Sequence, residues 1–239
     1  MARVEPDPFV RQRALPGFGT EGQRALADAR VAIVGVGGLG CPAALYLAAA
    51  GVGALTLIDA DHVTVSNLHR QILFGPDDVG NPKVDAAARV LGERAPWTTI
   101  TVVRSRIGAN DASDALRGHD VILDGTDTWE SRYAIADAAH ELGTPLVWGA
   151  VQGWFGQVTT FRDGAGLRDV FPTQPSPELD YCDAGGVLGA LCGQVGTAMA
   201  SQALVLLTRT ARTSQAAMSV LDARDGNWRS LPIAARDNA

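Results

Sequence analysis

A glycine-rich turn at residues 35–40 is the first pattern in this chain that suits chemistry. Gly35, Gly37 and Gly40 fit the spacing G-x-G-x-x-G between an apolar run and an Ala/Leu-rich segment. In such a turn the first two glycines let the backbone reach phosphate groups, and the third lets a helix pack closely on a strand. Asp59 ends the next apolar run, where a carboxylate can accept hydrogen bonds from both ribose hydroxyls or cap a turn. These residues predict a nucleotide site. A nicotinamide-dependent dehydrogenase would have the same pattern.

The loop after Asp59 separates these two interpretations. It places Asn67, Arg70 and Gln71 just beyond the carboxyl end of a predicted strand, where ligands bind in open α/β sheets. Lys83 then begins a predicted helix, although the helix dipole disfavours a cation at that end, so an anion is its expected partner. Taken alone, each of these cations is as often a solvated surface charge as a ligand for an anion. Together they predict work on the phosphates of ATP rather than hydride transfer.

Two carboxylates follow the fourth predicted strand, in the run Asp124-Gly-Thr-Asp127. Asp127 is positioned to hold Mg²⁺ through oxygen, as cation sites on nucleotide phosphates usually require. Asp124 stands at the strand end, where it can join the metal site, cap the next helix or orient the loop.

Hydrophobic periodicity predicts the elements that must position these residues. It predicts strands at 30–35, 54–58, 98–103, 120–124, 145–148 and 157–161 and near 216–221 and 227–231, and helices at 39–50, 83–94, 129–142 and 187–208. Residues 162–186 are predicted to be irregular. We therefore expect an α/β fold: a doubly wound, mainly parallel, Rossmann-like sheet with an antiparallel C-terminal extension. The whole chain, 1–239, is predicted to be a single domain, with its nucleotide-binding part at about 28–150 and a second part at about 151–239.

Composition limits the possible locations and partners. A content of 46% hydrophobic residues supplies a core. With a net charge of −6, a nucleic-acid-binding surface is not expected. Three widely spaced cysteines form no disulfide framework, which indicates a reducing cytoplasm. The polar N-terminus lacks the apolar run of a signal peptide. Residues 187–207 are apolar but interrupted by glycines, so we expect a buried helix and no membrane partner.

The ordered set of motifs resembles the ThiF/MoeB/HesA adenylyltransferases, relatives of the ubiquitin-activating enzymes. The resemblance runs from about Phe9 to about residue 231. It is carried by Arg11-Gln12, the GVGGLG turn, Tyr46-Leu-Ala-Ala-Ala-Gly-Val-Gly53, Leu57-Ile-Asp59, Ser66-Asn-Leu-His-Arg-Gln71, Gly80-Asn-Pro-Lys83, Asp124-Gly-Thr-Asp127 and Ala184-Gly-Gly-Val-Leu-Gly189. The glycine motif alone is weak, whereas the ordered set is highly specific.

The resemblance implies a reaction and a site. The C-terminal glycine carboxylate of a ubiquitin-like sulfur carrier ending in Gly-Gly would attack the α-phosphate of ATP, giving an acyl-adenylate and pyrophosphate for later thiocarboxylate formation. The part at 151–239 would bind that carrier. Nucleotide-binding residues, beside the glycines already named, would be Gly38, Asp59, Asp61, Ser66, Asn67, Leu68, His69, Arg70, Gln71, Lys83, Asp127 and Thr128, with Asp127 as the metal ligand. Arg11 resembles the arginine that this family inserts into the partner subunit's site, which implies a homodimer. The expected catalytic residues are Arg11, Arg70, Lys83, Asp127 and Cys182.

Such a reaction needs no general base, because the attacking carboxylate is already ionised. The enzyme has to cancel charge and align an in-line attack, which suits Arg11, Arg70, Lys83 and a metal ion.

Three departures from the family pattern refine this expectation. The first CxxC pair of many relatives would fall at Gly166-Leu-Arg-Asp169, and the second has no counterpart, so we expect no zinc and a match to the zinc-less, MoeZ-like branch. The usual Asp-Asn reads Asp127-Thr128. No rhodanese domain follows, so sulfur is expected from a separate donor protein.

The cysteines and the choice of substrate leave alternatives open. Cys182 precedes Ala184-Gly-Gly, where some relatives form a covalent link to the carrier and others do not need the thiol. Cys41 and Cys192 are predicted to be small core residues. Adenylation of another peptide C-terminus in a biosynthetic pathway is the second interpretation, and a non-catalytic nucleotide-binding scaffold is the third. The carrier itself could serve molybdopterin, thiamin, cysteine or a secondary metabolite.

Overall fold

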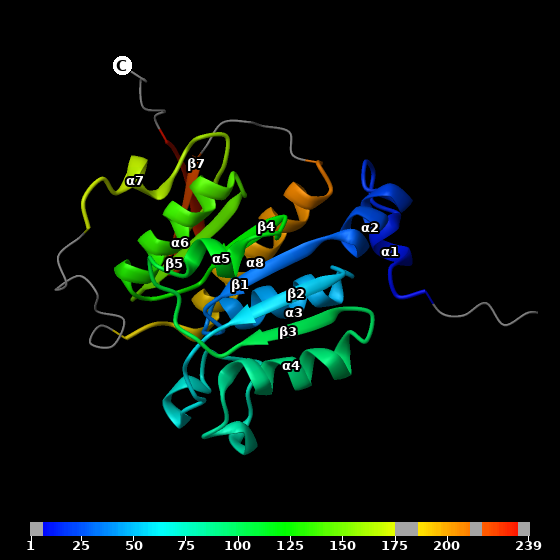
Figure 1. The fold of residues 1–239 in the computed structure, drawn as a ribbon, viewed down its shortest axis with the longest axis horizontal. Helices are drawn as coiled ribbons and strands as arrows, with labels where there is room; N and C mark the ends of the chain where they lie inside the picture. Colours follow the sequence, from blue (N-terminus) through cyan, green and yellow to red (C-terminus); the bar gives the residue numbers. More distant parts are fainter. Residues whose placement is uncertain (1–6, 175–185, 211–216, 234–239) are drawn as a thin grey trace, which may run out of the picture.

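The computed structural model describes residues 7–174, 186–210 and 217–233. These residues build one eight-stranded sheet with the order β3-β2-β1-β4-β5-β6-β7-β8 (Figure 1). Its strands are β1 (Arg30–Val34), β2 (Ala54–Ile58), β3 (Thr99–Val103), β4 (Val121–Asp124), β5 (Leu146–Gln152), β6 (Phe155–Phe161), β7 (Ala217–Asp222) and β8 (Asn227–Pro232). The first five are parallel and the last three antiparallel, so the predicted fold class is confirmed.

The four predicted helices occur where they were expected, and four further helices were missed. The helices are α1 (Val10–Arg13), α2 (Gly19–Asp28), α3 (Gly40–Ala49), α4 (Lys83–Arg94), α5 (Ala112–Leu116), α6 (Trp129–Leu142), α7 (Leu167–Val170) and α8 (Gly189–Leu207), with 3₁₀ turns at Val65–Asn67 and Pro76–Asp78. Helix α7 interrupts the segment 162–186 that was predicted to be irregular. Helix α6 ends at Gly143, whose φ of 64° lies in the left-handed region that terminates helices.

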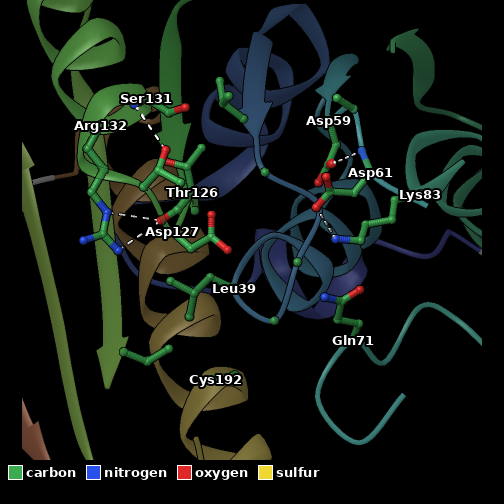
Figure 2. Close-up of a pocket in the computed structure, with 18 of the residues that line it drawn as sticks. Leu39, Asp59, Asp61, Gln71, Lys83, Thr126, Asp127, Ser131, Arg132 and Cys192 are labelled. Atoms are coloured by element: carbon green, nitrogen blue, oxygen red, sulfur yellow. Dashed lines mark hydrogen bonds and ion pairs between the residues drawn. The ribbon is translucent and has the colours of Figure 1, made fainter. Parts of the chain in front are cut away.

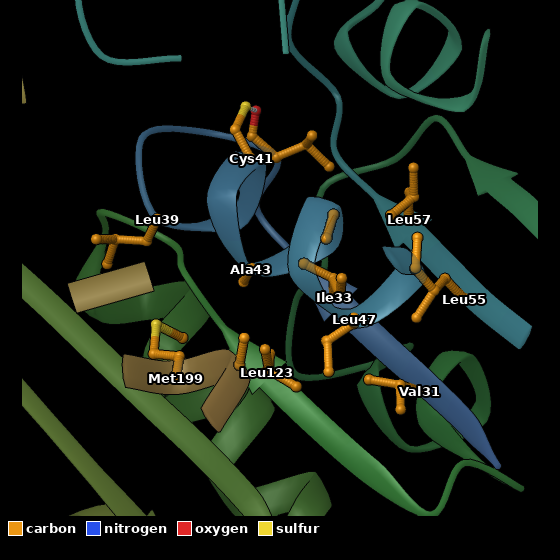
Figure 3. Close-up of a cluster of buried hydrophobic side chains, with 14 of the residues drawn as sticks. Val31, Ile33, Leu39, Cys41, Ala43, Leu47, Leu55, Leu57, Leu123 and Met199 are labelled. Carbon is orange, nitrogen blue, oxygen red and sulfur yellow. Dashed lines mark hydrogen bonds between the residues drawn. The ribbon is translucent and has the colours of Figure 1, made fainter. Parts of the chain in front are cut away.

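Alternate residues of the central strands enter two separate cores. In β1, Val31 and Ile33 pack in the core beneath α3, α4 and α8, whereas Ala32 and Val34 pack in the core beneath α6. Figure 3 shows part of the first core, with Val31 and Ile33 beside Leu47 of α3. Both faces of β1 are buried, which explains why its sequence is an unbroken apolar run rather than an alternating one.

Helix α8 is long and apolar enough to cross a membrane by length and composition, and 39% of that window is buried in this fold. It packs on α3 and on strands β5 and β6. Two strand glycines allow this close contact: a Cβ at Gly149 would lie 2.4 Å from the Met199 sulfur, and one at Gly156 would lie 2.4 Å from the Val195 side chain. The face of α8 that packs on the sheet therefore behaves as predicted for a core helix.

The strand order creates a crevice at the carboxyl ends of β1 and β4. From β1 the chain continues to β2, toward one edge of the sheet, and from β4 it continues to β5, toward the other edge. In doubly wound folds a ligand binds at this topological switch point. The glycine turn follows β1 and the Asp124–Asp127 turn follows β4, so the fold brings both predicted motifs to the crevice.

Candidate active site

A cavity occupies the crevice and gathers most of the predicted site. The residues from the predicted set that line it are Gly35, Gly37, Gly38, Asp59, Asp61, Arg70, Gln71, Lys83, Asp127 and Thr128. Figure 2 shows Asp59, Asp61, Gln71 and Lys83 on one side of the view and Thr126, Asp127 and Arg132 on the other. The cavity thus has two walls, one formed by the segment after β2 and the other by the segment after β4, with the glycine turn between them.

The glycine turn is built as its sequence predicts. Gly35 has a φ of 88°, and a Cβ there would lie 2.9 Å from the Gly125 backbone. A Cβ at Gly40 would lie 1.9 Å from the Gly35 carbonyl oxygen, so the third glycine lets α3 close onto β1 without lining the cavity. Gly37 and Gly38 remain at the cavity, where the N-terminus of α3 provides free N–H groups and the positive end of a helix dipole.

Asp59 sits at the end of β2 and is fixed by two backbone amides. Its carboxylate accepts from the N–H of Val36 at 2.7 Å and from the N–H of Asp61 at 2.8 Å. Burial raises the pKa of Asp59 above its ordinary value, and Lys83 together with the two amides partly opposes that rise. The side chain is therefore held in place as a hydrogen-bond acceptor whose ionisation depends on its surroundings.

This raised pKa predicts a pH dependence of nucleotide binding. Ionised Asp59 is the form that best accepts ribose hydroxyls, so ATP affinity should fall as pH drops through a pKa above 3.8. The effect on folding has the opposite sign: a raised carboxyl pKa stabilises the fold at low pH, and that stability is lost as pH rises through it. Calorimetry should show Asp59→Asn binding ATP about 10–100-fold more weakly. Wild-type affinity should also fall more steeply than that of Asp59→Asn as pH is lowered toward this raised pKa. The nucleotide phosphates titrate in both measurements, so a difference between the two pH curves reports on Asp59. Parallel curves would therefore contradict this assignment.

Cations line the cavity wall that is formed by the chain segments following β2 and β3. The Lys83 side chain is only 8% exposed, and its Nζ lies 2.9 Å from Asp61 Oδ2. Arg106 Nη2 lies 3.6 Å from the other oxygen of the same carboxylate. Lys83 is also the only lysine among the 20 basic residues of the chain. The anion that Lys83 meets in this structure is therefore Asp61, which lies between two cations inside the cavity.

The segment before Arg70 lies outside the cavity lining. Ser66, Asn67, Leu68 and His69 were predicted to bind nucleotide, but none of them lines the cavity. Instead, Arg70 Nη1 donates to the Ser66 carbonyl at 3.0 Å and lies 2.8 Å from His69 Nε2. The Asn67 carbonyl accepts from the N–H groups of Arg70 and Gln71 at 3.0 Å. This segment reaches the cavity only through Arg70 and Gln71.

Gln71 provides an independent sign of a ligand. The residue is 3% exposed, and its Oε1 is buried without a hydrogen-bond partner among the described residues. Buried acceptors are normally satisfied, so a ligand that donates a hydrogen bond fits this cavity. A nucleotide, with ribose hydroxyls and a base amine, provides such donors.

The opposite wall carries the carboxylate predicted to hold metal. Asp127 is exposed to the cavity. Asp124 is fully buried and does not line the cavity; its Oδ1 accepts from the N–H and hydroxyl of Thr126 at 2.9 and 2.7 Å. Of the three roles predicted for Asp124, the structure favours orientation of the loop. Thr128 caps α6 instead, accepting from the N–H of Ser131 at 3.4 Å while also lining the cavity.

Two predicted catalytic residues are not placed in this cavity. Arg11 is exposed on α1, which docks at the C-terminal end of α3 because Gln12 donates to the Ala50 carbonyl at 2.8 Å. The cavity lies at the other end of α3, about 15 Å away for a ten-residue helix. Cys182 lies outside the described residues.

Several cavity residues were not predicted. Arg106, Arg132, Ser105 and Thr126 line the cavity, and so does Cys192, which was predicted only as a core residue. Cys192 is 1% exposed, so its burial is confirmed. Arg132 had a usable signal, because it lies four residues after the helix cap and long side chains there point back toward the N-terminus. Cys41 is buried as predicted, and burial raises its pKa to about 12, which makes it unreactive at neutral pH.

Residues 9–239 match the model of the ThiF family. The chain is 38% identical over 240 residues to a Mycobacterium tuberculosis protein named "Probable adenylyltransferase/sulfurtransferase MoeZ", covering 98% of this chain but 61% of the relative. It is 38% identical to the sulfur carrier protein adenylyltransferase of Thermus thermophilus, covering 97% of this chain and 88% of the relative. Among solved structures, MccB of E. coli superposes with a TM-score of 0.86 over 98% of this chain and 74% of MccB, at 16% identity, and shares the fold. The chain belongs to the ThiF family.

Proposed function

We propose that this chain uses ATP to adenylate the C-terminal glycine carboxylate of a ubiquitin-like sulfur-carrier protein. The observation that carries the proposal is that one cavity gathers the cations Lys83, Arg70 and Arg106 and the Asp127 carboxylate around the glycine turn. A nicotinamide enzyme has no use for this arrangement. The names of the Thermus and Mycobacterium relatives, an adenylyltransferase and an adenylyltransferase/sulfurtransferase, support the same reaction.

Each wall has a distinct task in this reaction. Asp59 orients the ribose, and the N-terminus of α3 faces the phosphates. Lys83, Arg70 and Arg106 offset negative charge as the carrier carboxylate attacks the α-phosphate and pyrophosphate leaves. No residue has to remove a proton, because the nucleophile is a carboxylate. The cavity therefore works by alignment and charge neutralisation.

The residues at the cavity fit a magnesium ion bound together with ATP. Asp61, which also lines the cavity, pairs with Lys83 and Arg106, whereas Asp127 is exposed there with no ion pair to another described residue. Mg²⁺ is usually held by one or two carboxylates plus the substrate's phosphates and waters, which Asp127 suits. When bound, Mg²⁺ supplies neutralisation of phosphate charge. Asp127 would hold it, and the cations of the facing wall would bind the remaining phosphate oxygens.

Carrier-dependent exchange between ATP and labelled pyrophosphate tests the proposal directly. Small ubiquitin-like proteins ending in Gly-Gly should support exchange, and the same proteins lacking the terminal glycine should not. Exchange with an unrelated peptide only would favour the alternative substrate class. ATP binding without exchange for any candidate would favour a scaffold. In either case the proposed function would be wrong.

We also propose that the active protein uses Mg²⁺ without structural zinc and receives sulfur from a separate donor. Within the described ranges, no three His, Cys, Asp or Glu side chains gather at a potential metal site. Elemental analysis of the purified protein should show well under one zinc per chain, because the sequence has no CxxC pair. Exchange should survive a zinc-selective chelator and stop when Mg²⁺ is removed. One zinc per chain would overturn this expectation.

Cys182 is expected to be unnecessary for the first half of the reaction. Adenylation joins a carboxylate to ATP and requires no thiol nucleophile. Cys182→Ala should therefore keep carrier-dependent exchange within about threefold of wild type, a barrier change of about 0.65 kcal/mol. Any role of the thiol would then appear only in later transfer of the acyl group. Abolished exchange in a variant that still folds and binds ATP would show that this division of labour is wrong.

A further inference from the structure

A buried arginine holds the turn that precedes Asp127. Arg132 donates from Nε and Nη2 to the Thr126 carbonyl oxygen at 3.2 and 3.1 Å (Figure 2). From the other side, Asp124 Oδ1 accepts from the N–H and the hydroxyl of Thr126. Thr126 is thus fixed at its N–H, its carbonyl and its side chain. The next residue along the chain is Asp127.

Asp127 has no such anchor of its own. Its carboxylate makes no hydrogen bond or ion pair with any other residue in the described part of the chain, and it is exposed to the cavity. Its position is therefore set by the backbone that carries it. That backbone is held through Thr126.

The residues that hold Thr126 are charged and buried. Arg132 is 7% exposed, and its guanidinium carbon lies 5.0 Å from the ring centroid of Trp129 and 5.6 Å from that of Trp148. Asp124 is 0% exposed. Burying opposite charges is costly, and a well-packed apolar pair would often be at least as stable. A role in fixing geometry explains their presence better than stability does.

The two charges also depend on each other. Burial raises the pKa of Asp124, and Arg132 is the main influence that opposes the rise. Loss of Arg132 would remove both donors to the Thr126 carbonyl and would favour protonation of Asp124. A single substitution at Arg132 should therefore loosen both sides of the turn.

We propose that Arg132 and Asp124 are positioning residues that clamp Thr126, so that the Asp127 carboxylate meets the metal ion bound with ATP. This inference rests on the proposed function, in which Asp127 holds Mg²⁺. It assigns to the buried pair a role in metal-dependent binding that is separate from binding of the nucleotide itself.

The test compares ATP affinity with Mg²⁺ and with EDTA, measured by calorimetry, and takes the ratio of the two dissociation constants. Asp127→Ala should abolish the metal-dependent gain. Arg132→Met, which keeps apolar bulk between the tryptophans, should reduce that gain about tenfold, as the loss of a residue that supports a metal ligand commonly does. Arg132→Lys and Asp124→Asn should give intermediate losses. For the Arg132 and Asp124 variants, affinity in EDTA should fall less than affinity in Mg²⁺, so that the ratio changes.

Arg168→Met is the matched control. Arg168 also packs on an aromatic ring of α6, 4.5 Å from the Tyr133 centroid, and donates to Asp137 at 2.8 and 2.7 Å. It does not line the cavity, so its replacement should leave both affinities unchanged.

Several outcomes would overturn the clamp. If Arg132→Lys and Asp124→Asn both keep the wild-type ratio, Thr126 needs no clamp, even if Arg132→Met does not fold. If affinity in EDTA falls as much as affinity in Mg²⁺, the pair supports the cavity in general. An Asp127→Ala protein with the full metal effect would contradict both the clamp and the metal role. Metal-dependent ATP binding that depends on Arg132, without exchange for any carrier, would contradict the proposed function but not the clamp.

Discussion

Lys83→Ala is expected to lower carrier-dependent ATP–pyrophosphate exchange by about a hundredfold or more, comparable to the loss of one donor to a transition-state charge. The ammonium group belongs to a nearly buried side chain at the cavity wall, so water cannot fully replace it. Arg70→Ala should cause a loss of similar size, because Arg70 lines the same cavity. Exchange by a folded Lys83→Ala protein within about threefold of wild type would contradict the assignment.

The Asp61 carboxylate adds a second component that can be separated. Without Lys83, the only cation left beside Asp61 among the described residues is Arg106, at 3.6 Å, and the Asp61 charge would repel the phosphates. The double variant Lys83→Ala with Asp61→Asn should therefore recover part of the loss. Arg89→Ala is the matched control, since Arg89 lies on the same helix and pairs with Asp78 outside the cavity.

The single lysine makes this prediction easy to check by a second method. Apart from the chain's α-amino group, Lys83 carries the only primary amine in the chain. An amine-directed label that enters the cavity should therefore mark one side chain, and ATP should protect it. Labelling that ATP does not slow would place the nucleotide away from Lys83.

The long elements could be predicted because their signals are local. Each parallel strand is a short apolar run, and each long helix begins or ends at a residue with a recognisable backbone preference. Helices α1 and α2 depend on distant partners instead. The Gln12 and Gln23 side chains both donate to the Ala50 carbonyl, at 2.8 and 3.0 Å, which no local pattern reveals. Helices α5 and α7 span only five and four residues and are too short for a periodic signal.

The site residues also divide into those with a local signal in the sequence and those placed by distant contacts. Asp59 and Asp127 could be assigned to one cavity because both follow parallel strands whose carboxyl ends meet at the switch point. The pairing of Lys83 with Asp61 could not, since it joins residues 22 positions apart. It needs the bridge between His62 and Pro82 and the backbone hydrogen bond from Lys83 to Asp61. Arg132 carries a local signal in its place near the start of α6, but its contacts with the rings of Trp129 and Trp148 depend on the folded sheet.

The position of Arg11 bears on the prediction of a homodimer. Helix α1 lies at the end of α3 opposite the cavity, so Arg11 does not line the cavity of its own chain. The resemblance to the family implies that this arginine completes the site of a partner subunit. An exposed arginine on a short helix, without a hydrogen bond or ion pair to another described residue, is suited to contact with a second chain.

Mixing Arg11→Ala with Asp127→Ala protein should therefore restore exchange that neither variant shows alone. In a mixed dimer one site combines an intact Asp127 with the partner's intact Arg11, while the other site lacks both residues. Random pairing of equal amounts gives mixed dimers half of the time, so recovery should reach about a quarter of wild-type exchange. If Arg11 acted within its own chain, no pairing would assemble a complete site and mixing would restore nothing. Co-expression with two affinity tags isolates the mixed dimer, whose exchange should then be about half that of wild type. A protein that stays monomeric at micromolar concentration would rule out this arrangement, because no second chain would be present to supply the arginine.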